Sequence, residues 1–279
     1  MSLLGIREAV VASTDVPAAT AFHREAFGLE VLDGAPTAHD GVLLGVAGSP
    51  GGRLRLVPTT ATADPPPALW DYGARLLGIY SRDLAGTAQA MRAAGGEPRD
   101  PVSYAYGTAT MTELVGRGTD GIWWTIPQVT GDAHRPSPAL WADSERRHSE
   151  LHTAVLVVED HQAAVDLFTA AGMRPLFDAA MTGEEFERLV GMPAGASLRL
   201  AFMIGPEGAP ARLEIMSFTG VEAADRTADR VGIQRLVFTA EDPAADRASL
   251  VAAGAAELPD GDLQGPAGVR IALVAEESQ

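Results

Sequence analysis

Residues 152–172, HTAVLVVEDHQAAVDLFTAAG, hold the pattern that decides the fold: a strand-like run, an aspartate, an alanine-rich segment and a closing glycine. The same pattern occurs three more times, over residues 6–28, 75–95 and 234–254. The four aspartates lie 68, 77 and 82 positions apart and are Asp15, Asp83, Asp160 and Asp242. A unit that recurs four times at such intervals is a structural module, and the number of modules fixes the architecture.

Each copy of the pattern predicts a strand followed by a helix of about three turns. The aspartate can cap the helix, because its carboxylate accepts hydrogen bonds from the first free backbone N–H groups. The alanines that follow are strong helix formers, and the closing glycine suits the left-handed residue that ends many helices. Each copy is therefore expected to run from strand to capped helix.

Extended segments follow each predicted helix. Residues 42–46 and 53–57 flank a glycine-rich turn, which is typical of a β-hairpin. Similar pairs are 108–114 with 122–126 and 198–203 with 212–216, whereas the fourth copy has only one clear late strand, at 269–274. With one short strand directly after each helix, the module is βαβββ. The expected fold class is α+β.

Composition limits the partners and the location of the protein. The chain has 279 residues and a formal net charge of −16, which disfavours nucleic acid and anionic membranes as partners. It has no cysteine, so a disulfide or a zinc–thiolate site is excluded. The first residues lack the basic and apolar regions of a secretory signal, so we expect a cytoplasmic protein.

Two proline-containing segments, at 59–70 and 128–149, separate the modules. The second divides the chain into two halves of two modules each, so it is the better domain boundary. We expect a first domain at 1–130, with modules at about 1–60 and 71–130, and a linker at 131–149. The second domain is expected at 150–279, with modules at about 150–220 and 231–279. A monomer would then suffice for a complete cleft, although a homodimer stays open.

Paired βαβββ modules with this sequence pattern resemble the vicinal oxygen chelate superfamily, which includes glyoxalase I, bleomycin-resistance proteins and extradiol dioxygenases. The resemblance is most specific over Asp15 to Val31 and over 191–215. It implies two tandem domains, each with two paired modules that curl into a half-open barrel. It also implies a small organic molecule bound on the concave face. Where a divalent metal is present, residues on the first and last strands of each module hold it.

The residues at the metal-ligand positions that this resemblance implies are largely unsuited to metal. On the last strands these positions hold Arg55, Trp124, Glu214 and Ala272, of which only Glu214 is a carboxylate. On the first strands, seven residues before the capping aspartate, they hold Glu8, Leu76, Thr153 and Arg235. One position earlier stand Arg7, Arg75, His152 and Gln234.

The register of the strands decides the chemistry expected in the second domain, because neighbouring residues on a strand point to opposite faces. In the usual register, this domain presents Thr153, Glu214, Arg235 and Ala272 to the cleft, which is no metal site. If each first strand has a bulge, it presents His152, Glu214 and Gln234, which could hold a divalent metal. The competing interpretation is that His152 packs in the fold and Glu214 pairs with Arg235.

The first domain offers Glu8, Arg55 and Trp124, a set that suits ligand recognition more than metal binding. Arg55 could bind a carboxylate or pair with Glu8. Trp124 could stack on a planar ligand, or one of Trp123 and Trp124 could belong to the core. Elsewhere, residues 184–190 predict a short helix that covers the second cleft or a sheet edge. His23, on the first helix, is expected at the surface.

These observations favour a protein that binds a small organic molecule in a concave cleft without a competent metal site. The alternative is a divalent-metal-dependent lyase, isomerase or dioxygenase with its site in the second domain. A third hypothesis is a metal-free enzyme in which Glu8 or Glu214 acts as a general base.

Overall fold

The computed structural model describes residues 2–32, 41–62, 64–129, 137–206 and 211–276. It contains four βαβββ modules, as the repeated pattern predicts. The first module contains β1 (Leu3–Ser13), α1 (Val16–Phe27), β2 (Glu30–Val31), β3 (Val42–Gly45) and β4 (Arg53–Pro58). The second contains β5 (Gly73–Ser81), α2 (Leu84–Ala93), β6 (Glu97–Pro98), β7 (Val102–Tyr106), β8 (Ala109–Arg117) and β9 (Trp123–Pro127).

The third and fourth modules repeat this order with one insertion. The third contains β10 (His148–Val157), α4 (His161–Ala170), β11 (Arg174–Met181), α5 (Glu184–Val190), β12 (Ser197–Ile204) and β13 (Arg212–Thr219). The fourth contains β14 (Gly232–Ala240), α6 (Pro243–Ala252), β15 (Ala256–Glu257), β16 (Leu263–Gln264) and β17 (Arg270–Ala275). A further helix, α3 (Pro138–Ala142), lies in the segment expected to be a linker.

All four predicted helix caps are confirmed. The carboxylates accept from the backbone N–H groups of Ala18, Gly86, Ala163 and of Ala244 with Ala245. Gly28 ends α1 in the left-handed conformation, with φ 66°, where a side chain would be strained. Local sequence therefore sets where each helix begins and ends.

The strands form two sheets that combine the modules in an unexpected way. The first sheet joins the first and fourth modules, in the order β15-β16-β17-β14-β1-β4-β3-β2. The second sheet joins the second and third modules, in the order β11-β12-β13-β10-β5-β9-β8-β6, and β7 pairs with β8. Each sheet is held at its centre by two first strands in antiparallel pairing, β1 with β14 and β10 with β5.

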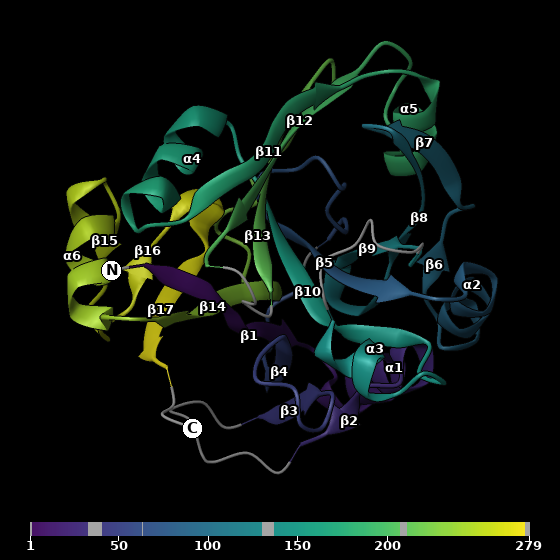
Figure 1. The fold of residues 1–279 in the computed structure, drawn as a ribbon, viewed down its shortest axis with the longest axis horizontal. Helices are drawn as coiled ribbons and strands as arrows, with labels where there is room; N and C mark the ends of the chain where they lie inside the picture. The colour runs from purple at the N-terminus through teal and green to yellow at the C-terminus, as the bar shows by residue number, and fades with distance from the viewer. Residues whose placement is uncertain (1, 33–40, 63, 130–136, 207–210, 277–279) are drawn as a thin grey trace.

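The helices group differently from the sheets. Helix α1 packs against α2, and α4 packs against α6, so helices of successive modules lie together. Figure 1 shows α4 and α6 on one flank of the molecule and α1 and α2 on the other. The fold class is thus α+β, with paired βαβββ modules in two half-open barrels. Among the described residues, no helix combines the length and the apolar character needed to cross a membrane.

A β-bulge recurs at the same position in all four modules. On β1 and β14 the register shifts at Arg7 and Gln234, and on β10 and β5 it shifts at His152 and Arg75. Each of these residues stands eight positions before the capping aspartate. A bulge places one extra residue in the strand and changes the direction of the side chains around it. The repeat therefore includes this irregularity as well as the helices.

Candidate functional site: two clefts of different chemistry

The concave face of the second sheet forms an enclosed and mainly apolar cavity of about 130 Å³. Its walls come from strands of both modules, because alternate residues of each strand point to the same face. The apolar lining residues include Leu76, Met111, Val115, Leu198, Leu200, Phe202 and Met216. This cavity, the second cleft, also contains four polar or charged side chains near its centre.

Glu113, on β8, is the buried acid of the second cleft. It is 8% exposed and accepts hydrogen bonds from two hydroxyl groups. The Tyr104 hydroxyl donates to Glu113 Oε2 at 2.6 Å, and the Thr125 hydroxyl donates to Oε1. Burial raises the pKa of Glu113 and outweighs these two hydrogen bonds, which act to lower it. The Tyr104 pKa is raised as well, first by burial and then by Glu113.

Glu214, on β13, is the second acid of this cleft and has a cationic partner. Arg212 donates to Glu214 Oε1 from Nε at 2.9 Å and from Nη2 at 2.6 Å. The Arg212 guanidinium also lies 3.8 Å from the centre of the Phe202 ring, which favours a cation over its face. Glu214 is therefore neutralised where it stands, whereas the two groups bonded to Glu113 are neutral hydroxyls.

Helix α5 covers the second cleft. It belongs to the third module but packs against β7 and β8 of the second, so it bridges the two walls (Figure 1). Phe186, Leu189 and Val190 line the cavity from the helix, and Phe186 lies 4.9 Å from the Tyr104 ring. Of the two roles predicted for residues 184–190, the cover of a cleft is the one that the packing supports.

The first sheet has a wider and more highly charged cleft, of about 1180 Å³. At its floor, Arg55 donates to both carboxylate oxygens of Glu8, at 2.7 and 3.0 Å, and both side chains are buried. This pairing confirms one of the two predictions made for Arg55. Further out, Arg235 donates to Asp262 at 2.6 Å, and Arg270 bonds to the same carboxylate at 2.7 Å. In this cleft, the first cleft, charges of opposite sign lie in contact.

The predicted grouping of side chains in the second domain is wrong because it assumed that neighbouring modules share a cleft. Arg235 and Ala272 lie in the first sheet, with Glu8 and Arg55. Thr153 and Glu214 lie in the second sheet. Thr153 is fully buried and packs over Gly78, which leaves no room there for a larger residue. Glu214 pairs with Arg212 and not with Arg235.

The prediction that Trp124 contacts a ligand is also wrong. Trp124 is fully buried in the core behind the second sheet, with its ring centre 4.4 Å from that of Phe27. The register shows why: Gly78 pairs with Thr125, just as Val10 pairs with Arg55. Thr125 is therefore the cleft residue that corresponds to Arg55, and the expected position was displaced by one residue. His23 is part of the same core and is buried, contrary to the expectation of a surface position.

The predicted metal set of His152, Glu214 and Gln234 does not come together. The bulge at His152 exists, but this ring stacks on Tyr80 at 3.9 Å between centres. Gln234 lies in the other sheet and donates to the carbonyl of Val231 at 3.1 Å. Among the described residues, no three histidine or acidic side chains are grouped so that they could hold a metal ion.

The donors at the strand positions implied for metal do not suit a divalent ion in either cleft. In the first cleft they are Glu8, Arg55, Arg235 and Ala272, two of them cationic. In the second they are Leu76, Thr125, Thr153 and Glu214, with one carboxylate that already binds Arg212. Divalent cations need several oxygen or nitrogen ligands without competing cations. We therefore route no chemistry through a metal.

Four polar residues of the second cleft were missed by the sequence analysis as site residues: Tyr104, Glu113, Thr125 and Arg212. Glu113 had a detectable signal, because it is a charged residue between Met111 and Val115 on an alternating strand. Such a residue on a buried face needs a partner or a function. The other three gave no comparable signal in the sequence.

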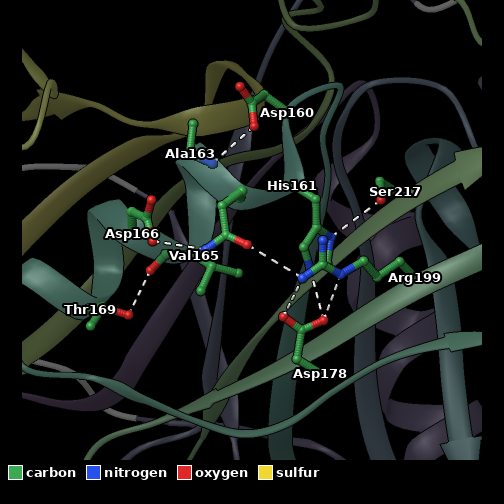
Figure 2. A network of polar contacts seen from close by, with 10 residues as sticks. Asp160, His161, Ala163, Val165, Asp166, Thr169, Asp178, Arg199 and Ser217 are labelled. Carbon is green, nitrogen blue, oxygen red and sulfur yellow. Dashed lines mark hydrogen bonds and ion pairs between the residues drawn. The ribbon is translucent and has the colours of Figure 1, made fainter.

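A polar cluster outside the clefts joins α4 to the second sheet (Figure 2). The Ser217 hydroxyl lies 3.3 Å from His161 Nδ1, and His161 Nε2 lies 3.4 Å from Asp178. Although this order is that of a serine hydrolase triad, both distances are long for hydrogen bonds. Arg199 binds both oxygens of Asp178 at 2.8 Å and lowers its pKa. We interpret the cluster as a structural contact between helix and sheet.

Comparison with known proteins agrees with this architecture. Residues 5–126 match the family described as Glyoxalase/Bleomycin resistance protein/Dioxygenase superfamily. In structure, the chain is similar to glyoxalase I from Zea mays, with 16% identity and a TM-score of 0.66, over 98% of this chain and 92% of that one. It is also similar to a presumed dioxygenase from Bacillus subtilis, with 11% identity and a TM-score of 0.66, over 99% and 86%. At these identities the likeness shows the fold alone. No curated protein matches the chain in sequence.

Proposed function

Because the chain belongs, through residues 5–126, to the glyoxalase, bleomycin-resistance and dioxygenase superfamily, we propose that it binds a small organic molecule. We place the molecule in the second cleft, without a resident metal. The observation that carries this proposal is the enclosed apolar cavity under α5, with polar groups gathered at one place on its wall. Small-molecule sites typically have this combination of apolar walls and few polar groups.

The size of the cavity limits the ligand. A cavity of about 130 Å³ is close to the volume of roughly 150 Å³ that accommodates benzene in an engineered protein core. A single aromatic ring or a short branched chain fits this space, whereas a larger molecule requires α5 to move. All strands around the cleft come from one chain, so a monomer is sufficient for binding.

A second candidate function is metal-free proton transfer by Glu113. Its raised pKa and its place in a covered cavity are features of catalytic acids and bases. The carboxylates named at first as general bases are less suitable, because Glu8 binds Arg55 and Glu214 binds Arg212. No contact in either cleft favours the metal-dependent alternative.

Ligand-observed NMR with a library of single-ring compounds tests the binding proposal. Leu200→Phe fills the second cleft, and Leu43→Phe is a matched control, since Leu43 lines the first cleft and both leucines are 6% exposed. We expect compounds that bind the native protein and the Leu43→Phe variant but lose binding to Leu200→Phe. Binding that Leu200→Phe leaves unchanged would place the ligand elsewhere and overturn the proposal.

Elemental analysis of the purified protein tests the metal-free part of the proposal. We expect far less than one equivalent of any divalent metal. One equivalent that disappears in Glu214→Ala would instead support a metal-dependent enzyme of the superfamily.

A further inference from the structure

The charges that line the second cleft do not balance. The described residues of its wall include two carboxylates, Glu113 and Glu214, and one guanidinium, that of Arg212. Arg212 is bonded to Glu214. The hydrogen bonds that Glu113 accepts come from uncharged hydroxyl groups, those of Tyr104 and Thr125. A cation placed beside Glu113 would complete the pairing that Arg212 already provides for Glu214.

Aromatic rings stand around this unpaired acid. Tyr104, Phe186 and Phe202 line the same cavity, together with Tyr80. The contact of Arg212 with the Phe202 ring shows that the wall already holds one cation over a ring face. Ring faces attract cations, and the attraction grows when water is excluded. An anion would meet two carboxylates in the same space and is disfavoured.

Resting on the proposed function, we propose that the ligand of the second cleft is a small organic ammonium ion. Its charged nitrogen lies against Glu113 and the Tyr104 hydroxyl, and its apolar body, about the size of one benzene ring, fills the space under α5. The ammonium donates hydrogen bonds to the carboxylate, and the Phe186 and Phe202 rings contact the carbon skeleton.

The state of Glu113 before binding gives this proposal a signature. A carboxylate buried without a counter-charge is costly, so the empty cleft favours the protonated acid. Glu214 acts in the same direction as burial and raises the Glu113 pKa, while Arg212 opposes it. An incoming ammonium reverses the balance, because it stabilises the ionised form. Binding should therefore release a proton from Glu113 wherever that group is protonated in the empty protein.

The expected pH dependence follows from the groups that face Glu113. These are Tyr104 from β7, Glu214 and Arg212 from β13, Tyr80 from β5 and Thr125 from β9, while α5 contributes only apolar side chains. Below the Glu113 pKa, each proton that must leave weakens binding, so affinity rises with pH. The rise ends where Glu113 is already ionised, and affinity falls again where the amine loses its own proton.

Calorimetry with benzylamine, benzyl alcohol and benzoate, three probes of similar size and different charge, tests the proposal. Titrations in two buffers with different ionisation enthalpies count the protons released. We expect benzylamine to bind about tenfold or more tightly than benzyl alcohol, because hydrogen bonds to charged groups are the stronger ones. Benzoate should not bind measurably. Proton release should accompany benzylamine and not benzyl alcohol.

Two variants assign the effect to the proposed residues. Glu113→Gln keeps the shape but cannot ionise, so it should abolish both the preference for benzylamine and the proton release. Tyr104→Phe removes one hydroxyl near the nitrogen and should weaken benzylamine several-fold while proton release remains. The Leu43→Phe variant should match the native protein. If Glu113→Gln does not fold, the proton count on the native protein still decides.

The outcomes separate this inference from the proposed function. Equal binding of benzylamine and benzyl alcohol, with both lost in Leu200→Phe, would overturn the ammonium ligand and leave the binding function intact. Binding that Leu200→Phe does not change, or tight binding of benzoate, would overturn both. A preference for benzylamine that persists in Glu113→Gln would overturn the role of Glu113.

Discussion

The two clefts are built from the same module and carry the same bulges, yet they handle buried charge in opposite ways. In the first cleft, Glu8 and Arg55 neutralise each other in a bidentate pair, and Asp262 is bonded to Arg235 and Arg270. In the second cleft, Glu113 has only neutral donors and an apolar surrounding. A shared fold therefore leaves the chemistry of each site to a few side chains.

The cover over the two clefts differs as well. The third module carries α5 between β11 and β12, whereas the fourth module has a short turn at the corresponding place, between β15 and β16. Exclusion of water raises the cost of an unpaired charge and strengthens its attraction to a counter-ion. The helix thus determines how strongly the unpaired acid of the second cleft acts on a ligand.

The largest expected effect comes from removing one charge of the first cleft. Glu8→Gln leaves Arg55 buried without its counter-charge and should lower the free energy of unfolding by about 3 kcal/mol or more. Urea denaturation at neutral pH measures the change. The double variant Glu8→Leu with Arg55→Met removes both charges and should regain most of the loss. A loss below about 1 kcal/mol in Glu8→Gln would show that the pair is solvated.

The core behind the second sheet should be acid-sensitive through His23. Burial lowers the pKa of His23 to about 4, from the ordinary value of 6.5, so the folded state resists protonation. The unfolded chain takes up the proton first, and stability is lost as pH falls from about 6.5 towards 4. The loss should reach roughly 2 kcal/mol between pH 7 and pH 5. Denaturation of His23→Phe at both pH values should show a smaller difference than the native protein, and an equal difference would contradict the assignment.

The equivalent change in the second cleft should have the opposite sign to Glu8→Gln. Because the Glu113 pKa is raised in the folded protein, this group opposes folding as pH rises above its unfolded value. Glu113→Gln removes this penalty and should raise stability by about 1 kcal/mol at alkaline pH, with less gain in acid. Thermal unfolding across pH provides the measurement. Destabilisation at every pH would mean that the carboxylate has an unseen counter-charge.

The smallest effect is expected outside both clefts. Arg199→Ala removes an ion pair with Asp178 on the outer side of the second sheet, where 42% of the Arg199 side chain is exposed. Such pairs contribute about 1 kcal/mol or less, and salt screens them. Denaturation at low and high salt should show a small loss that shrinks as salt increases. A loss comparable to that of Glu8→Gln would mean that α4 depends on this cluster.

The comparison also shows where sequence analysis loses its power. The position of Trp124 was displaced by one residue because two tryptophans stand side by side on β9, and a single step exchanges the cleft for the core. Glu214 was identified as a cleft residue, but its partner Arg212 was not. Glu113 was overlooked because it lies on β8, outside the strands that the family resemblance singles out.

The sequence by itself determined the local elements: four capped helices, the strands around them and the positions where one irregularity recurs. These depend on contacts a few residues apart, such as a carboxylate with the N–H groups of the next turn. Only the tertiary structure decided which modules share a sheet, and hence which side chains meet across a cleft. Edge strands of similar modules can pair in more than one way, and the choice depends on the packing of the entire chain.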